Sequence, residues 1–461
     1  MKKILAMALA LVLALGIFSG CTLVEEDDDN VVLATVNGVS ILKKDFNEVY
    51  NYYMYMYTNY GYDATTAATY VDGMASDILA DLVDQEVLKQ KAEAEGYLDY
   101  TEEHKKAAQE VIDEDKKAFV ESLVEEYKSA LEGQTLKGKN EGESDDDYFK
   151  RVAEAKYLEN LADSGTSVEK MLEDQLLSDA IERYKEDKLK DVTVLEADVI
   201  AEYDALAKEQ EQEFTTNAIY VKARSGQQIT LSSGATKTYN HFAFNHSGYS
   251  LVQQILVNFE QEDLDKLKAI VSSRDEYDEE IADRTATIEK ETDETKKAEE
   301  QALLDAAKKT RDEYQNQYDI ALKEACAKIQ AKTDEIYASV KDGDEANFIK
   351  VIIEKSDDNG MKTEEAAKKG YLVGPEDGMV TEFSKAAQAL EAGKISEPVA
   401  TYYGYHIIRS MEKLPEGKVP FEDIKEALTE TLTEEKKAAE WTKLVTSWTS
   451  EAKVKMYENR I

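Results

Sequence analysis

The stretch Val31-Val32-Leu33-Ala34-Thr35-Val36-Asn37-Gly38-Val39-Ser40-Ile41 decides how the N-terminal part of this chain folds. It places Asn37-Gly38 between two runs that are rich in β-branched residues. Both central positions of a type I′ turn need a positive φ, which Asn and Gly adopt most readily. The stretch therefore predicts a β-hairpin.

Upstream of the hairpin, the chain has the pattern of an export signal. Lys2 and Lys3 precede an uncharged apolar run over residues 4–18, and Ser19-Gly20 supplies the small residues that a signal peptidase needs beside its cut. The run is too short for a permanent membrane span, which needs about 20 apolar residues. Residues 1–20 are therefore predicted to be a signal peptide, followed by an acidic tether over residues 21–30.

Cys21 directly follows Phe18-Ser19-Gly20, and this order resembles the lipobox of bacterial lipoproteins. The resemblance implies that the thiol is diacylated and that Cys21 becomes the new N-terminus. Two acyl chains suffice for stable anchoring, so we expect an extracytoplasmic protein, lipid-anchored to the outer face of the bacterial cell membrane. The alternative is an ordinary secretory signal that happens to contain a cysteine.

The composition excludes several kinds of partner and site. The net charge of −40 becomes −42 when Lys2 and Lys3 leave with the leader, and so acidic a surface repels the phosphates of nucleic acids. The four histidines lack the spacing of metal ligands, so neither a metal nor a cofactor is expected. Cys326 is the only other cysteine, so no intramolecular disulfide can form once Cys21 is acylated. Cys326 is either buried and inert or forms an intermolecular disulfide bridge, and we favour burial.

Helical patterns follow the hairpin. The expected helices cover residues 43–60, 74–95, 104–131, 149–162, a segment that starts after Ser167, and 196–210, with a polar loop over 132–147. The first of them carries aromatic and Met side chains all round: Tyr50, Tyr52, Tyr53, Met54, Tyr55, Met56, Tyr57 and Tyr60. They indicate either a buried helix or an adaptable surface for unfolded clients, because Met and Tyr repack around varied side chains.

The N-terminal motifs resemble a known chaperone module. Val36-Asn37-Gly38, then Lys43-Lys44-Asp45-Phe46, then the run over residues 82–92 is similar to the chaperone module of PrsA-type and SurA-type foldases. Val192-Thr193-Val194 with residues 198–203 resembles the linker that precedes their isomerase domain. Residues 420–461 predict a helix and a short terminal strand that, by the same resemblance, pairs back with the N-terminal module.

A second resemblance lies further along the chain. Gly393-Lys394-Ile395-Ser396-Glu397-Pro398-Val399, Thr401 and Gly404-Tyr405-His406-Ile407-Ile408-Arg409 resemble the closing signature of parvulin-type (PpiC) prolyl isomerases. Gly370-Tyr371-Leu372 and residues 379–387 keep the family's order and spacing. Residues 249–259 are similar to the first parvulin strand, and residues 331–340 to the helix that follows it.

Between that strand and that helix lies a charge-rich insertion over residues 261–328 without Pro or Gly. Apolar or aromatic residues recur at roughly helical intervals in both of its halves, for example Leu264, Leu267 and Ile270 in the first, and Tyr314 and Tyr318 in the second. The pattern predicts a helical hairpin or antiparallel coiled coil. The alternative is a single solvated helix.

Together these features predict an α+β protein. A mainly helical SurA/PrsA-like chaperone module, built from residues 31–210 and 420–461, would carry an inserted parvulin-like domain over residues 240–415 with the long helical insertion. The composition agrees, since four prolines and abundant Ala, Glu, Lys and Leu favour helix.

The parvulin resemblance implies a site that needs neither nucleophile nor metal. Rotation about an Xaa-Pro bond faces a barrier of about 18–20 kcal/mol, which an apolar pocket lowers by preferring the twisted imide. Met379 and Phe383, four residues apart on a predicted helix, would wall the proline pocket, with plain core packing as the alternative. His406 and Thr401 would lie at its floor as catalytic residues.

Two residues depart from the family pattern. Gln254 stands where the first strand usually carries a His, although its amide can still hydrogen-bond Thr401 or His406. Lys368 stands two residues before Gly370-Tyr371, where the family has an acidic or thiol residue. These departures put the isomerase activity in question.

Three functions are therefore open. The first is a lipid-anchored extracytoplasmic foldase, a prolyl isomerase and chaperone that acts on unfolded secreted proteins or Xaa-Pro peptides. The second is a degenerate holdase that uses the parvulin domain for peptide binding. The third is a lipoprotein scaffold that binds an envelope partner through the coiled-coil insertion. The sequence leaves the oligomeric state open.

Overall fold

The computed structural model describes residues 29–130, 138–163 and 166–461. The predicted signal peptide, Cys21 and all but the last two residues of the predicted tether lie outside the described residues. The chain divides into two compact units, Met1–Val194 with Thr431–Ile461, and Leu195–Glu430. This division falls inside the range 31–210 that the sequence assigned to one module. Within the described residues, no helix has the length and apolarity that a membrane crossing requires.

The predicted hairpin is confirmed in the first unit. Strand β1 (Val32–Val36) pairs with β2 (Val39–Leu42), and Asn37 and Gly38 take the expected positive φ values of 52° and 96°. On its other side β1 pairs antiparallel with β11 (Val454–Met456), which confirms the predicted terminal strand. The two ends of the chain thus build one three-stranded sheet in the order β11-β1-β2.

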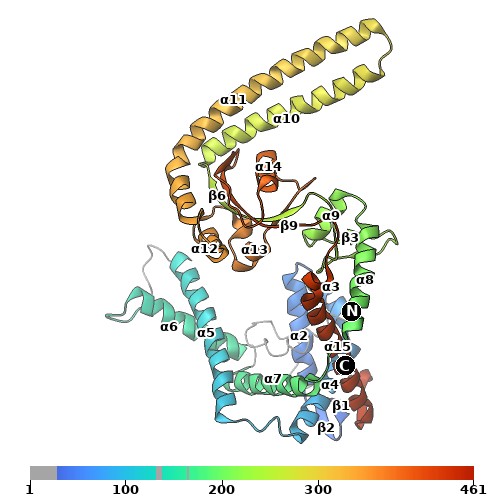
Figure 1. The fold of residues 1–461 in the computed structure, drawn as a ribbon. Coiled ribbons are helices and arrows are strands. Elements are labelled where there is room, and N and C mark those ends of the chain that lie inside the picture. Colours follow the sequence, from blue (N-terminus) through green and yellow to red (C-terminus); the bar gives the residue numbers. More distant parts are fainter. Residues whose placement is uncertain (1–28, 131–137, 164–165) are drawn as a thin grey trace. The chain divides into compact units, whose positions relative to one another are not determined.

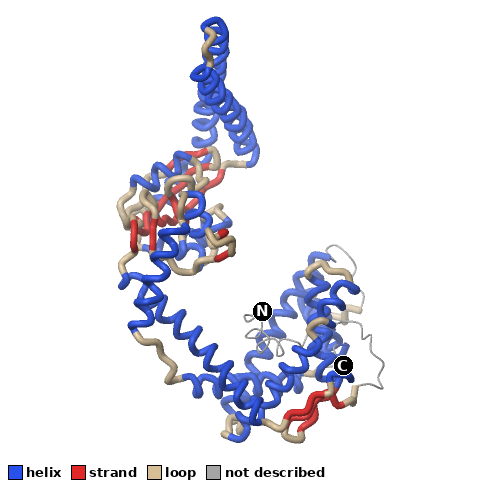
Figure 2. Tube along the Cα trace, turned by 90° about the vertical axis from the view of Figure 1, so that its right-hand side faces the viewer, coloured by secondary structure: helices blue, strands red, loops and turns tan. Residues whose placement is uncertain are grey.

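Six helices complete the first unit together with the end of the C-terminal helix. They are α2 (Lys43–Asn59), α3 (Ala64–Asp72), α4 (Ala75–Ala94), α5 (Glu102–Ala130), α6 (Asp145–Asp163) and α7 (Val168–Leu189), followed much later by α15 (Phe421–Glu451). Helix α4 buries Ile78, Leu79 and Val83 against the sheet. Figure 2 shows how far helices dominate the described chain.

Two details of this unit were not predicted. Helix α3 was missed, because its Ala- and Thr-rich sequence carries little hydrophobic periodicity; Asp63 caps it by accepting from the backbone of Thr65 and Thr66. The interpretation of the helix over residues 43–60 as a buried helix holds only in part: Phe46 is buried, and Tyr50, Tyr53, Met54 and Tyr57 pack against the core while partly exposed.

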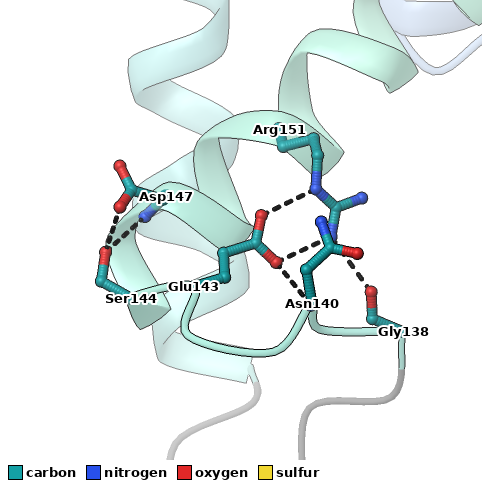
Figure 3. A network of polar contacts seen from close by, with 6 residues as sticks. All are labelled: Gly138, Asn140, Glu143, Ser144, Asp147 and Arg151. Atoms are coloured by element: carbon teal, nitrogen blue, oxygen red, sulfur yellow. Dashed lines mark hydrogen bonds and ion pairs between the residues drawn. The ribbon is translucent and has the colours of Figure 1, made fainter.

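An ionic network joins residues 138–143 to the first turns of α6 (Figure 3). Arg151 donates to the Glu143 carboxylate from Nε at 2.8 Å and from Nη2 at 3.0 Å, and its Nη2 also reaches the Gly138 carbonyl at 3.0 Å. The Asn140 amide donates to the same carboxylate at 2.9 Å. Arg151, and then the Asn140 amide, lower the pKa of Glu143 to about 2. Helix α6 begins at Asp145, so the loop predicted over 132–147 ends earlier than expected.

The second unit is organised around an antiparallel sheet in the order β7-β6-β9-β8. Its strands are β6 (Ser250–Asn258), β7 (Tyr371–Val373), β8 (Val399–Thr401) and β9 (Gly404–Lys413). Ile255, Val257 and Ile407 pack against the end of α11 (Glu294–Val340) and against α12 (Glu345–Lys355). Val252 and Ile408 pack instead with α14 (Thr381–Ala389). Both faces of the sheet are thus covered by helices.

The insertion is a helical hairpin, as predicted, and the alternative of a single helix is wrong. Helix α10 (Gln261–Lys290) runs antiparallel to α11, which continues without a break into the predicted parvulin helix 331–340 (Figure 1). The rings of Tyr277 and Tyr314 stack between the two helices with centroids 5.8 Å apart. Nearer the tip, Arg284 donates to Glu300 at 2.9 Å. The hairpin is therefore held by aromatic and charged contacts as well as by buried aliphatic residues.

The remaining elements of the second unit are short apart from α8. They are α8 (Glu196–Glu213), α9 (Asn217–Arg224), β3 (Ile229–Thr230), β4 (Thr236–Lys237), β5 (Phe244–Asn245), α13 (Glu364–Lys369) and β10 (Gly417–Lys418). The buried amide of Gln210 connects α8 to the following loop, since it donates to the His241 carbonyl at 2.7 Å and accepts from the Ala243 amide at 2.8 Å.

Candidate active site

Three of the predicted site residues come from three neighbouring strands. Gln254 lies in β6, His406 in β9 and Thr401 at the end of β8, and all three side chains are buried. Gln254 is paired directly with Ile408, which is two residues from His406 along β9. Directly paired residues share one face of a sheet, and so do residues two apart. Gln254 and His406 therefore lie on the face that α14 covers.

A chain of hydrogen bonds joins these side chains. The Gln254 Nε2 atom donates to Asp358 Oδ2 at 2.7 Å, and Gln254 Oε1 lies 2.6 Å from His406 Nδ1. The other ring nitrogen of His406, Nε2, lies 2.8 Å from Thr401 Oγ1. The hydroxyl of Thr401 in turn accepts from the backbone amide of Tyr403 at 3.1 Å. The expected contact between Gln254 and His406 is thus present.

This chain of bonds allows only one tautomer of the imidazole. Because the amide nitrogen of Gln254 donates to a carboxylate, its oxygen is the atom that faces His406, and that oxygen can only accept. His406 Nδ1 must therefore carry the proton. Nε2 is then the acceptor, and the Thr401 hydroxyl donates to it. Both ring nitrogens of His406 thus have a partner of the right kind, as buried polar groups require.

Burial keeps the imidazole neutral. It lowers the pKa of His406 from its ordinary 6.5 to about 4, although the negative charge of Asp358 works in the opposite direction. At neutral pH the ring is therefore an uncharged group that donates one hydrogen bond and accepts one.

Asp358 was not among the predicted residues, although it supplies the only carboxylate of the hydrogen-bond chain. It accepts from the Gly360 amide and from the Tyr371 hydroxyl, each at 3.0 Å, and these bonds hold it beneath Gln254. The available signal was the turn sequence Asp357-Asp358-Asn359-Gly360, since Asp side chains often bond the backbone two residues on. Lys368, at the position where the family has its acidic or thiol residue, is exposed and pairs with Glu364 at 2.6 Å.

The two predicted wall residues of the proline pocket do come together, but not on one helix. Phe383 lies in α14 and is 2% exposed, with its ring centroid 5.1 Å from that of His406. Met379 precedes the helix, because α14 begins only at Thr381; the prediction that both share a helical face is wrong on this point. Instead, the Met379 amide donates to the Asp377 carboxylate at 2.9 Å in the preceding turn. Both side chains still join the same apolar cluster as Val252 and Ile408.

The site thus places an aromatic and a thioether side chain beside a buried hydrogen-bond chain that contains the neutral imidazole of His406 and ends at the Asp358 carboxylate. Such surroundings suit an apolar ring and a tertiary amide, which carries no N–H that would need a partner. Rotation about an amide breaks no covalent bond, so it requires no nucleophile.

Comparison with protein families supports two parts of this description. Residues 309–412 match the PPIC-type PPIASE domain, and residues 1–136 match the SurA-like N-terminal domain. The first match covers the end of the α10–α11 hairpin, Asp358, Met379, Phe383 and His406. The second covers the β1–β2 hairpin and helices α2 to α5.

Among curated relatives, the chain is similar to foldase proteins PrsA of clostridia. It is 35% identical over 139 residues to the protein of Clostridium botulinum strain Langeland, which is 29% of this chain and 40% of the relative. It is 29% identical over 93 residues to the protein of Clostridium perfringens, 20% of this chain and 27% of the relative. The chain thus spans less than half the length of these relatives.

Solved structures of PrsA also resemble the chain. The crystal structure of PrsA from Bacillus subtilis has 15% identity and a TM-score of 0.23, covering 92% of this chain and 91% of that one. Foldase protein PrsA from Streptococcus pneumoniae has 14% identity and a TM-score of 0.21, covering 91% and 92%. Scores this low carry no argument about the arrangement of the whole chain. By its sequence the chain matches a SurA-like N-terminal domain and a PPIC-type PPIASE domain, and PrsA foldases are among its curated relatives.

Proposed function

We propose that this protein is an extracytoplasmic, lipid-anchored foldase that isomerises Xaa-Pro bonds in unfolded secreted proteins. The observation that carries the proposal is the buried hydrogen-bond chain from Asp358 through Gln254 and His406 to Thr401, which lies against the apolar wall of Phe383. Gln254 departs from the usual His, yet its amide makes one bond on each side and keeps the chain unbroken.

The proposed chemistry is preferential binding of the twisted imide. Phe383 and Met379 would grip the proline ring in a water-poor pocket, where a planar amide loses the hydration that stabilises its charge-separated resonance form. The orientation of His406 is set by Gln254 and Asp358, so the floor of the site needs no rearrangement when the bond rotates. Binding that favours the transition state over the planar forms raises the rate.

A proline-limited refolding assay with the full chain tests this proposal. Wild type should accelerate the slow phase of a reference protein, and Phe383→Ala and Thr401→Val should lose most of that acceleration. Lys368→Ala is the matched control, because Lys368 is exposed and lies outside the hydrogen-bond chain. An unchanged slow phase with wild type would contradict the isomerase proposal.

A second candidate function is that of a holdase without isomerase activity. It is favoured by α2. Most side chains from Tyr50 to Tyr57 are aromatic or Met, and all except the exposed Asn51 are half-exposed, so they are available to apolar clients. Suppression of client aggregation by both wild type and Phe383→Ala, combined with no effect on proline-limited refolding, would select the holdase.

The lipid anchor belongs to the same proposal. It is supported by the apolar leader and by the small residues before Cys21. In a bacterial host, wild type should take up labelled fatty acid and remain with the membrane fraction, whereas Cys21→Ser should do neither. Release of both proteins into the medium would contradict anchoring, and uptake of label by Cys21→Ser would place the lipid on another residue.

A further inference from the structure

The segment from Asp45 to Leu88 has an unusual composition for a chain with 56 Lys and Arg residues. It holds eight tyrosines and eight acidic residues, but no Lys, Arg or His. The segment covers most of α2, all of α3 and the first part of α4. Any cation that neutralises its carboxylates or lies on its rings must therefore come from elsewhere.

Three of these tyrosines form a cluster at the end of α2 and on α3. The rings of Tyr57 and Tyr70 stack with centroids 5.4 Å apart and an interplanar angle of 12°. Tyr62 meets both rings edge-on, at 5.8 Å from Tyr57 and 5.5 Å from Tyr70. Tyr62 is 44% exposed and Tyr70 is 49% exposed. We call these three residues the tyrosine face.

Two exposed carboxylates belong to the same segment as the tyrosine face. Asp63 follows Tyr62 directly, and Asp72, two residues after Tyr70, accepts from the Tyr50 hydroxyl at 2.8 Å. Both carboxylates belong to exposed residues. Further along, burial raises the pKa of Asp81 to about 6, and the charges of Asp84 and Asp77 add to the effect.

Elsewhere in the described chain, tyrosine rings carry cations that the protein itself supplies. Lys418 lies over Tyr203 at 4.4 Å, Lys237 over Tyr239 at 4.8 Å and Lys188 over Tyr184 at 5.0 Å. On the tyrosine face, the ring contacts among the described residues are to one another. The electron-rich ring faces and the neighbouring carboxylates therefore attract the same kind of group, a cation from a partner.

We propose that the tyrosine face, with Asp63 and Asp72, docks Lys- or Arg-bearing segments of unfolded polypeptide clients. This inference rests on the proposed foldase function and names the client chemistry. Charge complementarity selects a cationic partner and repels the anionic headgroups of lipids. Aromatic rings favour an organic cation with an apolar stem, such as Lys or Arg, which covers the ring while its charge meets the carboxylate.

Binding of a matched peptide pair to the full chain tests the charge preference. Two labelled, proline-free peptides are identical except that one carries lysines where the other carries glutamates. Fluorescence anisotropy should show tighter binding of the lysine peptide, and this preference should shrink as salt is added. Equal binding of the two peptides, or a preference that salt does not change, would overturn the proposal.

Two double variants locate the effect. Asp63→Asn with Asp72→Asn removes two charges at the face but keeps a capping side chain on α3 and an acceptor for Tyr50. It should weaken binding of the lysine peptide about threefold or more. The control is Glu276→Gln with Glu279→Gln, which removes two charges from exposed positions of α10 and should leave binding unchanged. Equal losses in both double variants would show only a general effect of net charge and would overturn the proposal.

A second pair of variants tests the rings. Tyr62→Leu with Tyr70→Leu keeps apolar area but removes the ring faces, and should weaken binding of the lysine peptide about threefold or more. Tyr62→Phe with Tyr70→Phe keeps the rings and should bind like wild type, which also shows that the region tolerates substitution. Full binding by the leucine variant would overturn the role of the rings.

A further measurement separates this inference from the proposed isomerase. Isomerisation of an uncharged Xaa-Pro peptide should be the same in wild type and in the Asp63→Asn, Asp72→Asn variant, because both residues belong to the first unit and the candidate active site belongs to the second. If wild type isomerises the peptide but shows no preference for the lysine peptide, the docking site alone is refuted. If wild type prefers the lysine peptide but has no isomerase activity, the isomerase is refuted and the docking site is supported.

Discussion

Lowering the pH tests whether His406 is the buried, neutral imidazole that the hydrogen-bond chain requires. Burial lowers the pKa of His406 from 6.5 to about 4 in the folded protein. As the pH falls through 6.5, the unfolded chain takes up a proton at this position, whereas the folded chain does not. The contribution of His406 to stability is therefore complete above pH 6.5 and is lost progressively down to pH 4.

The size of the effect follows from the two pKa values. Each pH unit between 6.5 and 4 removes about 1.4 kcal/mol from the free energy of unfolding, which amounts to about 3 kcal/mol in all. Domains have unfolding free energies of about 5–15 kcal/mol. Protonation of this one residue would therefore take away a substantial part of the stability of the second unit.

NMR of the histidine rings measures this pKa directly. The chain has four histidines, so the signal of His406 is assigned by its absence from His406→Asn. It should titrate near pH 4, and the nitrogen shifts should place the proton on Nδ1 at neutral pH. Isomerisation of an uncharged peptide should then be constant across the physiological pH range. A midpoint near 6.5, or a proton on Nε2, would refute the hydrogen-bond chain described here.

Three further predictions concern stability and local order. Phe383→Ala should lower the free energy of unfolding by about 3–5 kcal/mol in urea titrations, because it empties a buried site beside His406; a loss no larger than that of Lys368→Ala would contradict this. Gln254→Leu leaves the buried His406 Nδ1–H without an acceptor and Asp358 without one of its donors, and should lower the free energy of unfolding by about 1–3 kcal/mol for each group. NMR should then show the His406 proton spread over both ring nitrogens. An unchanged tautomer would show that Gln254 does not control the position of the proton. Arg284→Met should speed amide exchange near the tip of the α10–α11 hairpin by severalfold and leave β6 and β9 unaffected; faster exchange in the strands as well would mean that the hairpin and the sheet unfold together.

Local sequence signals were enough for most elements of the fold. Asn37-Gly38 between β-branched runs specified the hairpin, because few residues other than Asn and Gly adopt the positive φ values of its turn. The repeated apolar spacing of residues 261–328 specified two helices, and the absence of Pro and Gly within them agreed. The segment over α3 escaped prediction because its helix is set by an Asp63 cap and by packing rather than by periodicity.

The candidate site was predicted in part. The motif resemblance led to His406, Thr401, Gln254, Met379 and Phe383, and the structure gathers all five around one face of the sheet. It could not lead to Asp358, which is 104 positions from Gln254 along the chain and meets it only through the fold. Nor could spacing alone show that Met379 lies before the helix, since a turn anchored by Asp377 brings it beside Phe383 instead.

The sequence by itself determined the composition of the chain, the hairpin, the helical pattern and the identity of the residues that resemble a parvulin site. These features depend on neighbours within a few positions, so they can be read along the chain. Only the tertiary structure decided which nitrogen of His406 carries its proton, because that depends on Asp358 orienting the Gln254 amide across the sheet. It also decided that the rings of Tyr57, Tyr62 and Tyr70 meet, because their contacts arise where α2 packs against α3.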